Sequence, residues 1–321
     1  MTALSLDRAS AQTPPTQAGT LGELRTGGKP ALAGTLAKLE AAPDDATLTA
    51  LLTEAYLAPL GQVIGLTGPP GVGKSTLAGA LITTYRARGK SVGVIAVDPS
   101  SRRSGGALLG DRVRLRTDPE DQGVFIRSMA ARDQLGGLAE ITYGAMVLMR
   151  ALFDIVLVET VGVGQSETDI SMAADTIVFC VQPGSGDSLQ FMKAGIVEIP
   201  DIVVVTKGDM GHAAIRARAD VKGALGMSAE PSLDWTVAVR IVTATSGEGV
   251  DALIGEIAEH WHWLTQGSGD GHRLTERRRL QAQLWLKQAI KERYGREGLK
   301  RLGTLSLAPD TAPFGLLAKM D

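Results

Sequence analysis

The sequence has a single cysteine, Cys180, among its 321 residues. One cysteine excludes an internal disulfide framework and is typical of a protein from a reducing compartment, so a cytoplasmic location is expected. Cys180 stands within the apolar run 177–181, which predicts a small buried core residue rather than a reactive thiol.

The sequence also has no large excess of basic over acidic residues, or of acidic over basic ones. Lysine and arginine total 33 against 35 acidic residues, a net charge of −2, which indicates neither a nucleic-acid partner nor a membrane surface. No apolar run approaches the roughly 18 residues of a membrane span. Residues 1–20 lack an apolar signal core and are poor in arginine, so no targeting signal is expected.

What the chain does contain is an alternation of short apolar runs with helical patterns. Most runs are apolar at successive positions, as strands covered on both faces should be. Strands that alternate with helices predict an α/β fold with a mostly parallel central sheet flanked by helices. The predicted strands are 63–67, 91–97, 124–128, 155–159, 176–181, 202–206 and 237–243.

Four regions are expected along the chain. These are a disordered lead-in (1–29), an N-terminal helical extension (30–60), the α/β core (61–265) and a C-terminal helical arm (266–321). The arm contains a charged helix over 274–294 that must dock an apolar stripe on its own domain or on a second subunit. Its predicted anchors are Leu280, Leu284, Trp285 and Ile290.

One segment matches the phosphate-loop pattern G-x-x-x-x-G-K-[ST] at every fixed position, between a predicted strand and a predicted helix. Its backbone N–H groups are expected to surround an anion at a helix N-terminus. Lys74 should reach the β- and γ-phosphates, and the Ser75 hydroxyl should bind Mg²⁺. The nucleotide-binding segment is Gly68, Pro69, Pro70, Gly71, Val72, Gly73, Lys74, Ser75 and Thr76.

Carboxylates follow two of the predicted strands, where a phosphate-loop enzyme needs an acid for Mg²⁺. Asp98 ends one strand and Glu159 ends another. A carboxylate at the end of an apolar strand is costly without a partner, which favours a metal-linked role. Gly162, three residues after Glu159, would place its N–H against the γ-phosphate. Asp111, in an irregular segment between these strands, is a further candidate ligand.

A third motif predicts the choice of base. Thr206, Lys207 and Asp209 form the [NT]-K-x-D element after a predicted strand. The Asp209 carboxylate would accept hydrogen bonds from guanine N1–H and N2–H₂, which adenine does not offer, so GTP is favoured over ATP. Thr245 and Ser246, after the last predicted strand, occupy the usual place of a loop that contacts guanine O6.

Together these segments resemble the MeaB/ArgK/MMAA family of P-loop GTPases, the chaperones of adenosylcobalamin-dependent mutases. The resemblance spans about residues 30–265, and Thr206 stands where the family often has asparagine. The segments that carry it are 65–76, 97–101, 105–112, 136–139 and 159–167.

The resemblance implies a GTPase in which Lys74, Glu159 and Gly162 are catalytic, with Mg²⁺ as cofactor and GTP or GDP bound. Ser75, Asp98, Asp111 and Glu159 would surround the metal. Two switch segments are also implied, one with Gly162, Val163, Gly164 and Gln165, and one with Asp187 and Lys193. Gln165 is one candidate for orienting the attacking water.

The implied partner is methylmalonyl-CoA mutase or a related B12-dependent mutase, to which the adenosylcobalamin itself belongs. The protein would gate cofactor delivery to the mutase and protect it from inactivation, and a cobalamin adenosyltransferase is a further implied partner. The implied form is a homodimer assembled through the C-terminal arm.

Three alternatives stay open. A GTPase metallochaperone for another metalloenzyme would need a Cys/His cluster, whereas the four histidines and one cysteine are scattered. A signal-recognition-type GTPase shares Thr-Lys-x-Asp but brings a different helical domain. A third possibility is a scaffold that binds GTP and hydrolyses it too slowly to matter.

Overall fold

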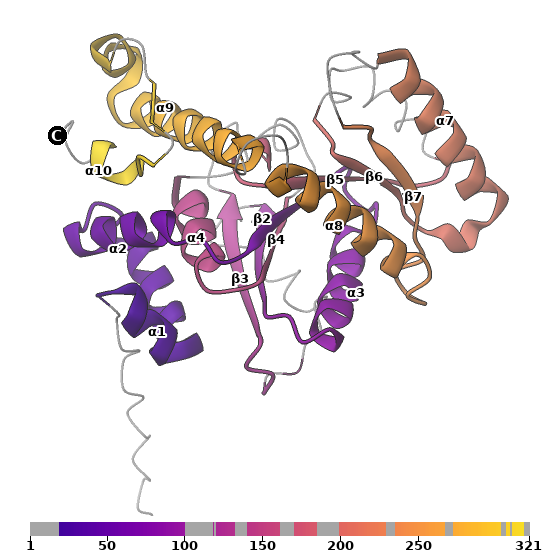
Figure 1. The fold of residues 1–321 in the computed structure, drawn as a ribbon, viewed down its shortest axis with the longest axis horizontal. Helices are drawn as coiled ribbons and strands as arrows, with labels where there is room; N and C mark the ends of the chain where they lie inside the picture. The colour runs from indigo at the N-terminus through magenta and orange to yellow at the C-terminus, as the bar shows by residue number, and fades with distance from the viewer. Residues whose placement is uncertain are drawn as a thin grey trace, which may run out of the picture.

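A computed structural model describes residues 19–99, 118, 120–131, 140–160, 170–184, 199–228, 235–266, 272–302, 306–308 and 310–317. Its strands are β1 Gln62–Thr67, β2 Val92–Pro99, β3 Val124–Ala131, β4 Ile155–Glu159, β5 Thr176–Val181, β6 Ile202–Val205 and β7 Ala238–Ile241. They form one sheet in the order β3-β2-β4-β1-β5-β6-β7 with every pairing parallel (Figure 1). The predicted α/β fold with a parallel central sheet is therefore confirmed.

Helices cover both faces of this sheet. The helices are α1 Leu21–Ala41, α2 Ala46–Leu57, α3 Lys74–Ala87, α4 Glu140–Arg150, α7 His212–Ser228, α8 Val250–Gln266, α9 His272–Leu302 and α10 Phe314–Leu317, with short 3-10 turns η1 Ile170–Met172 and η3 Gly208–Met210. On one face Ile64 and Leu66 of β1 pack in the same core as α3 and α8, whereas Val63 joins the core of α1, α2, α4 and α9 on the other. Burial on both faces explains the unbroken apolar runs.

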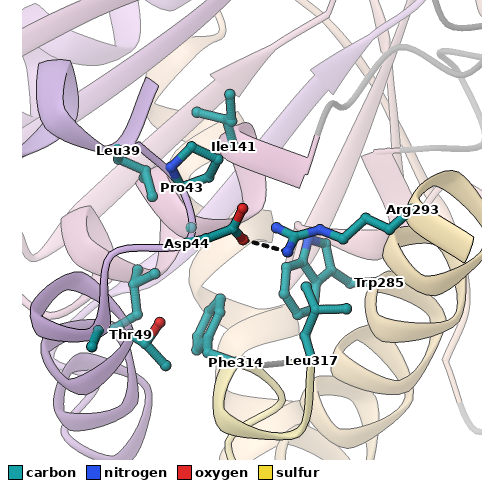
Figure 2. A pocket seen from close by; sticks show the side chains of 12 residues that line it. Leu39, Pro43, Asp44, Thr49, Ile141, Trp285, Arg293, Phe314 and Leu317 are labelled. Atoms are coloured by element: carbon teal, nitrogen blue, oxygen red, sulfur yellow. Dashed lines mark hydrogen bonds and ion pairs between the residues drawn. The ribbon is translucent and has the colours of Figure 1, made fainter. Parts of the chain in front are cut away.

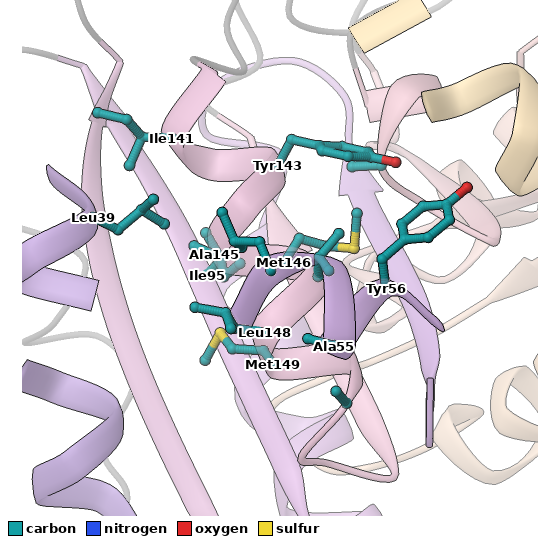
Figure 3. Packing of buried hydrophobic residues seen from close by; sticks show 14 of the residues in the cluster. Leu39, Ala55, Tyr56, Ile95, Ile141, Tyr143, Ala145, Met146, Leu148 and Met149 are labelled. Atoms are coloured by element: carbon teal, nitrogen blue, oxygen red, sulfur yellow. The ribbon is translucent and has the colours of Figure 1, made fainter. Parts of the chain in front are cut away.

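The second of these cores is built around α4. Figure 3 shows Tyr143, Met146 and Met149 of α4 between the sheet and the N-terminal helices. None of the helices in the described part of the chain combines the length and hydrophobicity needed to span a bilayer.

The N-terminal helix begins earlier than predicted. The lead-in expected over 1–29 is wrong beyond residue 20, because α1 starts at Leu21 with Thr20 as its N-cap. Thr20 and Glu23 form a reciprocal capping box that satisfies the first N–H groups, which is a local signal for the start of a helix. The predicted boundary instead falls at a kink, where Gly28 has a φ of 59° and Pro30 follows.

The charged C-terminal helix docks on its own domain. Trp285 and Ile290 of α9 are buried, and the Trp285 ring stacks on Tyr143 of α4 with centroids 5.1 Å apart. The other two predicted anchors are wrong: Leu280 and Leu284 are 45% and 49% exposed. Position along the helix did not reveal which stripe faces the core, because Arg277 and Arg278 of α9 point to buried acids of the sheet.

Those acids stand immediately before β5 and β6. Asp175, fully buried, accepts two hydrogen bonds of 2.8 Å from Arg278 and one of 2.8 Å from the Val63 N–H. Asp201 accepts hydrogen bonds of 3.0 and 2.7 Å from Arg277. Two successive arginines of α9 therefore fasten this helix to the amino ends of the sheet.

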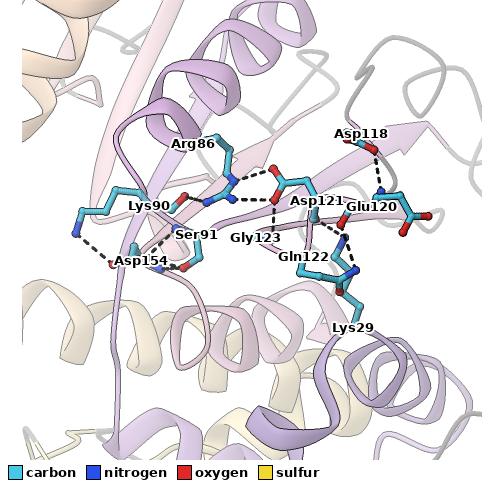
Figure 4. Close-up of polar contacts among 10 residues, drawn as sticks. All are labelled: Lys29, Arg86, Lys90, Ser91, Asp118, Glu120, Asp121, Gln122, Gly123 and Asp154. Atoms are coloured by element: carbon cyan, nitrogen blue, oxygen red, sulfur yellow. Dashed lines mark hydrogen bonds and ion pairs between the residues drawn. The ribbon is translucent and has the colours of Figure 1, made fainter.

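A second polar network closes the amino ends of β2, β3 and β4. Figure 4 shows Arg86 of α3 paired with Asp121, at 2.8 and 2.7 Å, and Asp154 accepting from the backbone and hydroxyl of Ser91. Lys29 of α1 donates to the Asp121 carbonyl at 2.6 Å. The edge opposite the predicted phosphate loop is thus occupied by structural ion pairs.

The buried pair predicts an acid-sensitive stability. Burial opposes ionisation of Asp175, but Arg278, Arg150 and the Val63 N–H outweigh it and hold the pKa of this carboxyl below its usual value. A lowered folded pKa gives stability that is present above the unfolded pKa, near 3.9, and is lost as the pH falls through the folded pKa. We expect Asp175→Asn to lose about 3–5 kcal/mol of unfolding free energy at pH 7.

Urea titration at pH 7 and at about pH 3 would measure this loss, which should shrink at the lower pH because the unfolded carboxyl of the wild type is then protonated and must give up that proton on folding. Asp251→Asn is the matched control, since its pair with Arg88 is exposed and should contribute less than about 1 kcal/mol. A pH-independent loss in Asp175→Asn would show that the carboxyl charge is not its cause.

Candidate functional site

The predicted phosphate loop lies between the carboxyl end of β1 and the first turn of α3. Gly68 has a φ of 130°, and a Cβ there would lie 2.2 Å from the Cys180 carbonyl oxygen of β5. Gly73, the N-cap of α3, has a φ of 104°, in the left-handed region that favours glycine. The loop therefore depends on glycine for close approach and for its turn, and it leads directly into a helix N-terminus.

The two functional side chains of the loop start α3. Lys74 is 6% exposed, and its Nζ donates to the carbonyls of Gly68 at 2.7 Å and Pro69 at 3.0 Å. The Ser75 Oγ donates to the Glu159 Oε1 at 2.7 Å. The structure thus brings Lys74, Ser75 and Glu159 together, as the motif spacing predicts, while Pro70 and Thr76 are exposed on the same loop.

Strand register explains how Glu159 reaches this place. Glu159 pairs with Leu66 of β1 on one side and with Ala96 of β2 on the other, and it is 4% exposed. Asp98 lies two residues beyond Ala96 on β2, so its backbone is at the same carboxyl edge. The remaining predicted metal and switch residues lie outside the described residues: Asp111, Gly162, Val163, Gly164, Gln165, Asp187 and Lys193.

The chemistry of this set suits Mg²⁺. A hydroxyl and a buried carboxylate within hydrogen-bond distance are oxygen donors of the kind that Mg²⁺ takes together with phosphates and water. In the described ranges no group of three or more His, Cys, Asp or Glu side chains is placed to hold a metal by itself. A metal here would therefore share its coordination with the nucleotide.

The predicted base residues follow β6 and β7. Lys207 and Asp209 are exposed, and η3, which contains Asp209, is anchored by the Gly208 N–H donating to the Val242 carbonyl at 3.1 Å. Thr245 and Ser246 are also exposed, in a turn closed by the Ser246 N–H and the Thr243 carbonyl at 3.2 Å. The loops after adjacent strands β6 and β7 thus lie on the same edge of the sheet as the phosphate loop.

Thr206 has a role that the sequence alone did not reveal. It is 3% exposed, and its Oγ1 lies 2.6 Å from the Val72 carbonyl of the phosphate loop and 2.9 Å from the Val181 carbonyl at the end of β5. A hydroxyl has one proton, so it donates to one of these carbonyls at a time. Thr206 thereby connects the phosphate loop to the strand that carries the base residues.

Two other features are not part of this site. Cys180 is fully buried, and burial raises the pKa of its thiol to about 12, which confirms a core residue rather than a reactive thiol. A cavity of about 340 Å³ lies between α1, α2, α4, α9 and α10, with the Asp44–Arg293 ion pair at its edge (Figure 2). None of its lining residues comes from the phosphate loop or the base loops.

Comparison with known proteins identifies a family of GTPases. The model of the family described as "Methylmalonyl Co-A mutase-associated GTPase MeaB" matches residues 32–299. A Pyrococcus horikoshii protein named as a GTPase is 44% identical over 232 residues, which cover 71% of this chain and 72% of the relative. The methylmalonic aciduria type A homolog of Mus musculus is 38% identical, over 73% of this chain and 56% of its own length.

A solved crystal structure has the same fold as this chain. The crystal structure of a LAO/AO transport system kinase superposes with a TM-score of 0.64 at 25% sequence identity, covering 93% of this chain and 95% of that one. The similarity therefore includes the helical extensions as well as the sheet.

The Thr206 contact predicts a measurable effect on nucleotide binding. Thr206→Val keeps the shape but removes the hydroxyl, so the Val72 carbonyl loses its donor and the phosphate loop is held less firmly. We expect the Kd for GDP, measured with a fluorescent analogue, to rise roughly tenfold. Thr206→Ser retains the hydroxyl and should bind nearly as the wild type does. Equal affinity in Thr206→Val and the wild type would mean that this contact does not support binding.

Proposed function

The chain belongs to the MeaB family of P-loop GTPases, and from this membership we propose that it uses GTP to control a B12-dependent mutase. It is a GTPase, as its relatives are named and as the fold supports. The finer assignment is the proposal: the chain gates delivery of adenosylcobalamin to methylmalonyl-CoA mutase or a related enzyme, and protects that enzyme. The observation that carries it is the family match over residues 32–299, whose description names the mutase.

The described residues have the chemistry for the hydrolytic step. We propose that the backbone N–H groups of 71–76 bind the phosphates and that Lys74 offsets the charge that develops on the γ-phosphate during in-line attack by water. Ser75, Glu159, Asp98 and Asp111 would hold Mg²⁺, which supplies charge neutralisation between the β- and γ-phosphates. Phosphoryl transfer depends mostly on positioning and electrostatics, and the Lys74–Ser75–Glu159 arrangement meets both needs.

Base recognition is assigned to the opposite end of the site. Asp209 would accept the guanine N1–H and N2–H₂ hydrogen bonds, with the Lys207 stem along the base and the Thr245–Ser246 turn near O6. A carboxylate in this place is left unpaired by adenine, which favours GTP. We also propose that Gly162, Val163, Gly164, Gln165, Asp187 and Lys193 act as switch residues. The protein would be a cytoplasmic homodimer, and a cobalamin adenosyltransferase would be its second partner. The exposed Leu280 and Leu284 of α9 are compatible with the dimer.

The first test addresses hydrolysis. Lys74→Ala should lower the rate of GTP hydrolysis at least about a hundredfold, because it removes the ammonium group proposed to offset the charge on the γ-phosphate. Phosphate release under single-turnover conditions is the measurement. Lys90→Ala is the control, since this exposed lysine at the far end of α3 pairs with Asp154. Near-normal turnover in Lys74→Ala would remove this lysine from the mechanism.

The second test addresses the partner. Purified protein is mixed with methylmalonyl-CoA mutase in GDP and in a non-hydrolysable GTP analogue, and complex formation is followed by size-exclusion chromatography. We expect a complex whose stability differs between the two nucleotides, since a ligand shifts an equilibrium only through differential affinity. Absence of any complex with B12-dependent mutases in either state, with hydrolysis intact, would reject the chaperone role and leave the GTPase assignment standing.

A further inference from the structure

We propose that Gln182 is a positioning residue for the guanine site, which holds the Lys207 ammonium group across the phosphate loop. The proposal rests on the proposed function, in which the protein binds a guanine nucleotide. Besides the loops after β6 and β7, the residue after β5 would then contribute to the base site. Its basis is the side-chain contact between Gln182 and Lys207, made by residues that follow two neighbouring strands.

Lys207 needs such support. It is the one residue other than glycine in the described ranges with a positive φ, at 53°, a conformation that L-residues rarely adopt. Its side chain is exposed, and a free lysine would lose considerable rotamer entropy on lying against a base. The strained backbone and the loss of side-chain rotamer entropy both oppose a single conformation of Lys207. Hydrogen bonds at its Nζ therefore hold its aliphatic stem in the position that contacts the base.

Two acceptors meet that Nζ, and they come from different parts of the edge. One is the Gly71 carbonyl of the phosphate loop, at 3.2 Å, and the other is the Gln182 side-chain oxygen. The carbonyl belongs to Gly71, which is exposed on the phosphate loop, whereas Gln182 directly follows β5 and is half-buried. Gln182 therefore provides the acceptor that is fixed to the sheet.

The chemistry of glutamine suits this role. Its amide oxygen accepts a hydrogen bond from an ammonium group, which has donors only. A neutral amide accepts this hydrogen bond without adding a negative charge near an anionic ligand. The neighbouring strand order, with β5 between β1 and β6, puts Gln182 between the phosphate loop and the base loop, so one side chain affects both.

The experiment is a double-mutant cycle on GDP affinity, with Gln182→Ala, Lys207→Ala and the double variant, read by titration with a fluorescent GDP analogue. Gln182→Ala should raise the Kd about tenfold, equivalent to about 1.4 kcal/mol. In the Lys207→Ala background the same change should have almost no further effect, because its target is gone. Gln182→Glu keeps an acceptor oxygen and should restore most of the coupling with Lys207.

A matched control is Gln122→Ala, which alters an exposed glutamine before β3 and should bind as the wild type does. Additive effects of Gln182→Ala and Lys207→Ala, or wild-type affinity in Gln182→Ala, would overturn the inference while the wild type still binds GDP. A wild type that binds no guanine nucleotide would instead overturn the proposed function. The two failures are therefore distinguishable within one set of titrations.

Discussion

The parallel pairing of β1 with β4 on one side and β5 on the other is the constraint on which the site depends. It brings the carboxyl ends of three strands to one edge, with Leu66 beside Glu159 and Thr67 beside Phe179. Because the loop after β1 opens a helix, the backbone N–H groups of α3 face the same place. The consecutive residues Lys74 and Ser75 therefore meet a buried carboxylate, Glu159, from a distant part of the chain.

The opposite edge of the sheet has a different task. Acidic residues that precede β5 and β6 are held by successive arginines of α9, and Asp121 and Asp154 close the ends of the neighbouring strands. These contacts make the C-terminal helix part of the domain, and they lie at the edge of the sheet opposite the phosphate loop. Buried pairs of this kind are costly to break, which suits a permanent attachment.

The phosphate and base halves of the site are joined through the phosphate loop. Thr206 reaches the Val72 carbonyl and Lys207 reaches the Gly71 carbonyl, so residues after β6 contact two consecutive loop residues. A nucleotide that orders one half therefore acts on the other through short hydrogen bonds. In a GTPase, this direct connection offers a physical route by which the state of the phosphates reaches the surrounding loops.

The sequence by itself determined the fold class, the seven strands and the position of the phosphate loop, because period, spacing and glycine placement are local properties of the chain. It also indicated the acid at the end of β4, since an apolar strand that ends in a carboxylate needs a partner. The start of α1 is equally local, because the Thr20–Glu23 capping box encodes it. Only the tertiary structure decided the contacts between distant elements. These are the burial of Trp285 rather than Leu284 against the domain, and the hydrogen bond from Thr206 to the phosphate loop. These depend on which strands are neighbours and which helix face meets a buried acid, and no spacing within one segment encodes that.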